Sequence, residues 1–140
     1  MKQIPVIFWT GTGNTQMMAD AVAEAINAAG AEAVVKNVSE ISAGEAAGYD
    51  ALALGCPAMG AEVLEECEFE PFFTELEGKL AGKKVALFGS YGWGGSYMQD
   101  WEARVKDAGA TLVADGVLAL GAPDDEAMAK LAEAGKLLAE

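Results

Sequence analysis

Short apolar runs alternate with segments of helical periodicity from one end of this chain to the other. Five apolar runs predict strands, at residues 4–9, 33–36, 50–55, 84–89 and 111–120. The segments between them repeat apolar residues three and four apart, which is typical of helices that pack on a sheet. We therefore predict an α/β fold in which helices cover both faces of a five-stranded parallel sheet. The length of 140 residues indicates one domain, spanning residues 1–140.

Three of the predicted strand-to-helix loops contain the residues that could form a site. They span residues 10–15, 55–62 and 90–95 and are rich in glycine. Right-handed crossovers place all such loops at the carboxyl edge of a parallel sheet. Ligands of open α/β sheets bind beyond this edge, so we expect the three loops to meet there.

The first of these loops reads Thr10-Gly11-Thr12-Gly13-Asn14-Thr15. Backbone N–H groups at a helix N-terminus, together with threonine hydroxyls, form a site for a phosphate. The dinucleotide fingerprint is excluded because Gln16 replaces its third glycine, and no P-loop Gly-Lys-Ser/Thr follows the strand. The turn contains no Lys or Arg, so we predict a phosphate that stays bound rather than one that is transferred. A turn that merely connects two elements is the alternative.

The composition excludes several functions. The chain has no histidine, which removes the commonest general base, the Ser-His and Cys-His pairs and most transition-metal sites. A formal net charge of −13 opposes binding to nucleic acid. No apolar run approaches the roughly 20 residues of a membrane span, and the N-terminus does not read as a signal peptide. Cys56 and Cys67 are too few for a disulfide scaffold, so we expect a cytoplasmic protein.

The second and third loops complete a recognisable pattern. They read Gly55-Cys56-Pro57-Ala58-Met59-Gly60-Ala61-Glu62 and Ser90-Tyr91-Gly92-Trp93-Gly94-Gly95. Together with the first loop they resemble the short-chain flavodoxins, small electron carriers that bind flavin mononucleotide (FMN). The resemblance extends over essentially the whole chain and includes Glu70-Pro71-Phe72-Phe73. It implies the flavodoxin-like three-layer sandwich with strand order 2-1-3-4-5.

The resemblance implies a role in FMN binding for each loop. The first loop would hold the phosphate, while Met59 and Trp93 would cover opposite faces of the isoalloxazine ring. Glu62 would accept a hydrogen bond from the ring N3–H, and the N–H groups of Gly92 and Trp93 would serve the N1/O2 edge. The residues expected to bind FMN are Thr10, Gly11, Thr12, Gly13, Asn14, Thr15, Pro57, Ala58, Met59, Gly60, Ala61, Glu62, Ser90, Tyr91, Gly92, Trp93 and Gly94.

Two positions of the second loop have particular consequences. In flavodoxins with Met-Gly-x-Glu, the peptide that corresponds to Gly60–Ala61 reorients when the flavin becomes a semiquinone, and its carbonyl accepts from N5–H. Glycine permits that backbone conformation at little strain. Pro57 stands where several relatives carry a serine, so a proline that stiffens the loop replaces one hydroxyl contact. We expect Cys56 to be a small buried apolar residue and not a reactive thiol.

The resemblance implies an electron-transfer protein, not an enzyme, with no catalytic residue and no metal. It would be a monomer that shuttles single electrons on the semiquinone/hydroquinone couple of FMN. The three loops contain no Lys or Arg but do contain Glu62, so the reduced anion should be disfavoured and its potential low. Acidic side chains could steer basic-faced redox proteins (reductases or oxidoreductases), or could be merely solvated. These side chains are Glu62, Glu65, Glu66, Glu68 and Glu70.

Other functions fit the same architecture. An FMN-dependent NAD(P)H reductase would need a second pocket, for which 140 residues leave little room. A binding module without a cofactor would be colourless when purified. A receiver domain requires clustered aspartates at strand ends, where this chain has Thr10 and Cys56, and it is rejected.

Overall fold

The structure is a computed structural model that describes residues 3–9, 13–57, 68–91, 96–120 and 123–140. Within these residues six strands form one sheet of parallel pairs, with the main order β2-β1-β3-β4-β5. The predicted α/β class and strand order 2-1-3-4-5 are confirmed. The strands are β1 (Gln3–Phe8), β2 (Glu32–Asn37), β3 (Ala51–Gly55), β4 (Lys84–Tyr91), β5 (Thr111–Leu112) and β6 (Val117–Leu120).

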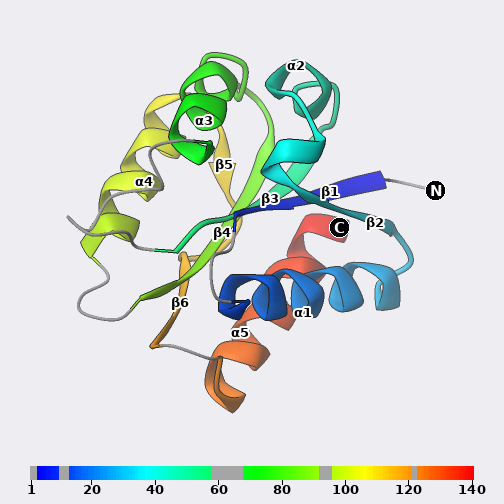
Figure 1. Ribbon diagram of the computed structural model, residues 1–140. Coiled ribbons are helices and arrows are strands. Elements are labelled where there is room, and N and C mark those ends of the chain that lie inside the picture. Colours follow the sequence, from blue (N-terminus) through cyan, green and yellow to red (C-terminus); the bar gives the residue numbers. More distant parts are fainter. Residues whose placement is uncertain (1–2, 10–12, 58–67, 92–95, 121–122) are drawn as a thin grey trace.

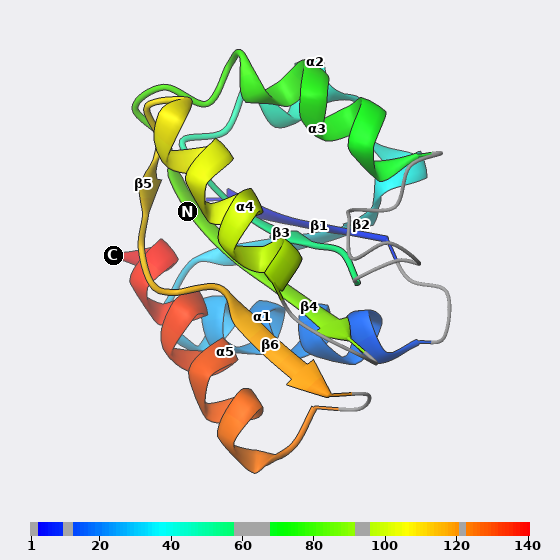
Figure 2. The same cartoon turned by 90° about the vertical axis from the view of Figure 1, so that its left-hand side faces the viewer.

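Helices cover both faces of the sheet, as Figures 1 and 2 show. Helices α1 and α5 lie side by side on one face, and α3 and α4 lie on the other with the short α2. A 3₁₀ turn, Val38–Glu40, follows β2. The helices are α1 (Asn14–Ala28), α2 (Ala43–Ala46), α3 (Phe69–Glu77), α4 (Ser96–Asp107) and α5 (Asp125–Ala139).

The central strands are buried on both faces. In β3, Leu52 and Leu54 belong to the apolar cluster under α3 and α4, whereas Ala53 belongs to the cluster under α1 and α5. All five residues of β3 are buried. A strand that is covered on both faces reads as a continuous apolar run, which is why the sequence predicted this strand so directly.

The last predicted strand, 111–120, is interrupted in the structure. Its first part, β5, pairs with the start of β4, and its second part, β6, pairs with the end of β4. Residues 113–116 separate the two parts, and the Glu102 carboxylate of α4 accepts a hydrogen bond from the Gly116 N–H at 2.7 Å. A side chain from a neighbouring helix therefore satisfies a backbone donor at the break. Interruptions of this kind are common on edge strands, where they discourage pairing with other chains.

Arg104 of α4 braces this helix against α3. Its guanidinium donates to both carboxylate oxygens of Glu70, at 2.7 and 2.9 Å, and to both of Glu77, at 3.1 Å. It also lies 4.7 Å from the ring centroid of Phe73. The hydrogen bond from Arg104 is the main reason that the pKa of Glu70 is lowered. Two-pronged pairing of this type is among the stronger ionic contacts in proteins.

Replacing Arg104 with Ala should lower the free energy of unfolding by about 1–3 kcal/mol, because two half-buried carboxylates lose a charged donor. Urea denaturation measures this change. The control is Lys130→Ala, which removes an exposed pair with Glu126 at 3.4 Å on α5. An exposed pair of this spacing contributes about 0.3–0.5 kcal/mol. An equal loss of unfolding free energy in the two variants would contradict a stabilising role of the Arg104 ion pairs between α4 and α3.

The pairing of Arg104 with Glu70 should also make the free energy of unfolding depend on pH. The pKa of Glu70 is lower in the folded protein than its usual value of 4.5, so the pairing stabilises the fold fully above that value. This contribution disappears as the pH falls through the lowered pKa. We therefore expect the difference in unfolding free energy between wild type and Arg104→Ala to shrink as the pH falls from about 6 to about 3. A difference that stays constant over this range would show that Arg104 acts through packing alone.

Candidate functional site

The loops that follow β1, β3 and β4 begin at one edge of the sheet. These three strands are adjacent and parallel, so their carboxyl ends lie together. The pairing continues one residue beyond the strands: Trp9 N–H donates to the Gly55 carbonyl at 3.0 Å, and Cys56 N–H donates to the Phe88 carbonyl at 3.1 Å. The described ends of the three predicted loops therefore meet, as expected from the topology.

The N-terminus of α1 presents hydrogen-bond donors at this edge. Gly13 is the N-cap residue, and its φ is 94°. As a glycine, it has no side chain that could accept a hydrogen bond from the first turn of the helix. The first helical hydrogen bond runs from Met17 N–H to the Gly13 carbonyl at 3.1 Å, so the N–H groups of residues 14–16 have no acceptor within the helix. No acidic residue lies in this first turn. The arrangement offers amide donors and the positive end of the helix dipole to an anion.

Two buried hydroxyl groups join the first and third loops. The Thr15 Oγ1 and the Ser90 Oγ lie 3.2 Å apart, and these residues are 1% and 6% exposed. Each hydroxyl carries one hydrogen, and the bond between the two uses only one of them. The other hydrogen can be donated to a bound group. Two predicted site residues separated by 75 positions in the chain are thus in direct contact.

The remaining predicted site residues fall into two groups. Asn14, Pro57 and Tyr91 are half-buried at the described ends of their loops. The others lie outside the described residues, and their roles stay predictions. These are Thr10, Gly11, Thr12, Ala58, Met59, Gly60, Ala61, Glu62, Gly92, Trp93 and Gly94.

Cys56 and Trp9, which directly follow β3 and β1, differ in their environment. Cys56 is fully buried, as predicted. Trp9 is only partly buried, because it lies at the rim of the apolar cluster, where its Nε1 donates to the Glu68 carboxylate at 3.3 Å. Glu68 therefore contacts Trp9, and Glu70 is paired with Arg104. These two members of the predicted docking surface have partners within the chain, and the other three lie outside the described residues.

Tyr97 is a residue of this edge that the sequence analysis missed. Its hydroxyl donates to the Cys56 carbonyl at 2.7 Å, and its side chain is buried. Burial is the main cause that raises the pKa of Tyr97. The spacing of Tyr97 and Trp101, four residues apart, shows that both face inward from α4. That spacing predicts burial but does not reveal a hydrogen bond to a distant carbonyl.

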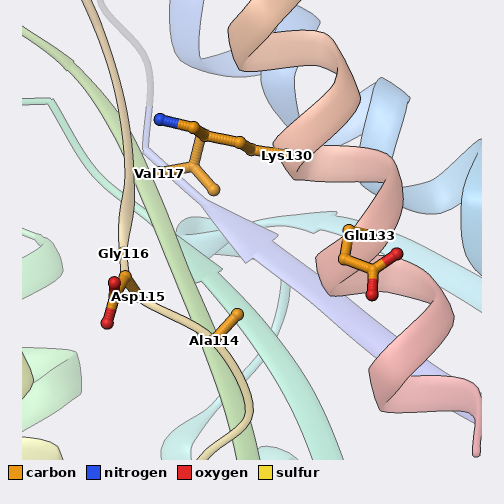
Figure 3. Close-up of a pocket in the computed structure, with 6 residues that line it drawn as sticks. All are labelled: Ala114, Asp115, Gly116, Val117, Lys130 and Glu133. Carbon is orange, nitrogen blue, oxygen red and sulfur yellow. The ribbon is translucent and has the colours of Figure 1, made fainter.

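A hollow of about 230 Å³ lies elsewhere, between α5 and the connection from β5 to β6 (Figure 3). None of the predicted site residues lines it; its lining is Ala114, Asp115, Gly116, Val117, Lys130 and Glu133. Val117 pairs with Phe88, three residues before the end of β4, so the hollow lies beside the sheet and not at its carboxyl edge. We therefore assign the site to the edge and not to the hollow.

Metal-ligand clusters and membrane-spanning helices are both absent from the described residues. Among them, no cluster of three or more Cys, Asp or Glu side chains could hold a metal ion. No helix in the same part of the chain has the length and apolar character required to cross a membrane.

The donors at this edge fit the phosphate of FMN. A phosphate accepts hydrogen bonds, and the described groups are helix N–H groups and the hydroxyls of Thr15 and Ser90. The space beside the N-cap is open, since a Cβ on Gly13 would meet no described atom within 4 Å. This chemistry agrees with a bound anion that is held without a cation.

The chain matches the flavodoxin family model over residues 6–135. It is 47% identical over 135 residues to a flavodoxin of Clostridium beijerinckii, covering 96% of this chain and 97% of that protein. It is 46% identical over 116 residues to a flavodoxin of Megasphaera elsdenii, covering 82% and 85%. The solution structure of the two-electron reduced M. elsdenii flavodoxin superimposes with a TM-score of 0.89 at 42% identity, covering 97% of this chain and 98% of that one.

The fold, together with these matches, thus defines an electron-transfer protein that uses a flavin nucleotide. This chain belongs to the flavodoxin family. Flavodoxins bind FMN and carry electrons between oxidoreductases, and they are not enzymes.

Replacing Thr15 with Val should weaken FMN binding. The change preserves the shape of the side chain but removes its hydroxyl and leaves Ser90 without this partner. We expect the dissociation constant to rise roughly tenfold, the loss of one hydrogen bond to a charged group. Quenching of flavin fluorescence measures the constant. Thr74→Val is the matched control, because its hydroxyl bonds Glu70 on α3 at 2.7 Å. Unchanged affinity in Thr15→Val would exclude this hydroxyl from the site.

Proposed function

We propose that this flavodoxin is a low-potential one-electron carrier that holds FMN tightly and without a covalent bond. The observation that carries the proposal is the convergence of neutral donors, without a described cation, at the edge where the three loops begin. The alternative of an FMN-dependent NAD(P)H reductase is not favoured, because relatives that match nearly the whole chain are flavodoxins.

Each loop has a separate task in this proposal. FMN, when bound, supplies the one-electron chemistry. The first loop and the hydroxyls of Thr15 and Ser90 hold its phosphate, and the second and third loops enclose its ring between Met59 and Trp93. Pro57 limits the freedom of the second loop, while Gly60 permits its backbone to adopt more than one conformation.

The charge distribution supports a low potential. The chain carries 9 basic and 22 acidic residues, and no Lys or Arg occurs in the three loops. Lys83 and Lys84 lie at the start of β4, at the opposite edge of the sheet, where they donate to the carbonyls of Tyr49 and Glu140. Lys36 lies on the outer strand β2, which carries none of the three loops. Negative surroundings disfavour the addition of further negative charge to the flavin.

The same charge distribution supports the partners we propose. A net charge of −13 attracts proteins with basic faces over distances of about a Debye length, roughly 8–10 Å in physiological salt. We propose that basic-faced oxidoreductases in the cytoplasm exchange electrons with this chain, which acts as a monomeric domain of residues 1–140.

A spectroscopic redox titration tests the low-potential proposal. The protein should take up two electrons in separate steps, with the second potential well below the first. Glu62→Gln should raise the second potential, because it removes one negative charge from the second loop and keeps an acceptor oxygen. Glu133→Gln, on α5, is the control and should leave both potentials unchanged. Two electrons that enter at the same potential would contradict the proposal.

A further inference from the structure

The second loop begins at a peptide that Tyr97 holds from outside the loop. The Cys56 N–H donates to the Phe88 carbonyl of β4, and the Cys56 carbonyl accepts a hydrogen bond from the Tyr97 hydroxyl at 2.7 Å. The next residue, Pro57, has no N–H with which to extend the pairing. We propose that Tyr97 is a positioning residue for FMN, because it fixes the Cys56–Pro57 peptide from which the second loop starts. This inference rests on the proposed function, since it takes the second loop to contact the flavin.

The Tyr97 ring is held firmly enough to fix a peptide. It stacks on Trp101 with centroids 6.4 Å apart and an angle of 25°. Trp101 in turn makes edge contacts with Phe69 at 5.5 Å and with Phe73 at 5.9 Å. All four side chains are buried. A ring enclosed in this way leaves its hydroxyl little freedom, so the position of the Cys56 carbonyl is determined by the packing of α3 and α4.

The backbone of β4 leaves room for this hydrogen bond only because residue 89 is a glycine. A Cβ built on Gly89 would overlap both the Tyr97 hydroxyl and the Cys56 carbonyl. The bond therefore lies directly over Gly89 of β4. It links the start of the second loop with the strand that leads into the third loop and with the helix that follows the third loop.

The Tyr97 hydroxyl and the buried Cys56 carbonyl are suited to a hydrogen bond that persists. Cys56 is fully buried, and a buried carbonyl that loses its donor costs free energy. Burial is the main cause of the raised pKa of Tyr97. The hydroxyl consequently stays protonated, and able to donate, throughout the physiological pH range. Phenylalanine would fill the same space but could not hold the carbonyl.

Tyr97→Phe tests the inference in the FMN-bound protein. We expect the variant to release FMN roughly 3- to 10-fold faster, the usual effect of losing one hydrogen bond, and its first reduction potential to shift. Flavin fluorescence after dilution measures release, and a redox titration measures the potential. The matched control is Tyr49→Phe, which removes a hydroxyl near the other end of β3. It should leave both quantities unchanged.

The outcomes separate this inference from the proposed function. If wild type binds FMN and Tyr97→Phe keeps the wild-type release rate and potentials, Tyr97 has only a structural role and the inference is wrong. If wild type does not bind FMN, both proposals are wrong. Should Tyr97→Phe fail to fold, NMR of the FMN-bound wild type decides. A slowly exchanging Tyr97 hydroxyl proton coupled to the Cys56 carbonyl carbon supports the inference, and absence of that coupling overturns it.

Discussion

The parallel pairing of β3 with β1 on one side and β4 on the other is the constraint on which the rest of this structure depends. Each pairing extends one residue past the strands, through Trp9 to Gly55 and through Cys56 to Phe88. The loops that leave these strands must consequently start side by side. Covering helices on both faces bury the strands, so the register cannot slip without moving apolar side chains to the wrong face. The register of the sheet thus places the starts of these loops at one edge.

The described part of the site relies on neutral donors. The N-terminus of α1 and the hydroxyl pair of Thr15 and Ser90 can hold an anion without contributing a full positive charge. A lysine or arginine here would hold the phosphate more strongly, but it would also stabilise the reduced flavin anion and raise its potential. In the function we propose, binding by amides and hydroxyls combines tight retention of the nucleotide with a low potential, two properties that a cation would bring into conflict.

Sequence patterns predicted the elements that are defined locally and missed those that depend on distant contacts. The buried strand at 50–55 was recognisable, because its residues are contiguous. The break at 113–116 was missed, since its backbone donor is satisfied by Glu102, which belongs to a different element. Glu70 looked like part of an exposed acidic surface, yet it pairs with Arg104, 34 residues away. Likewise, Tyr97 bonds a carbonyl 41 positions earlier, and such a contact leaves no periodic signal.

The central claim is that backbone amides and hydroxyls at this edge hold the phosphate of FMN. The most direct measurement compares the binding of FMN and of riboflavin, which has the same ring but no phosphate, to the flavin-free protein by fluorescence quenching. Because several hydrogen bonds to a charged group would be lost, FMN should bind at least roughly 100-fold more tightly than riboflavin. Equal affinities for the two flavins would contradict the account.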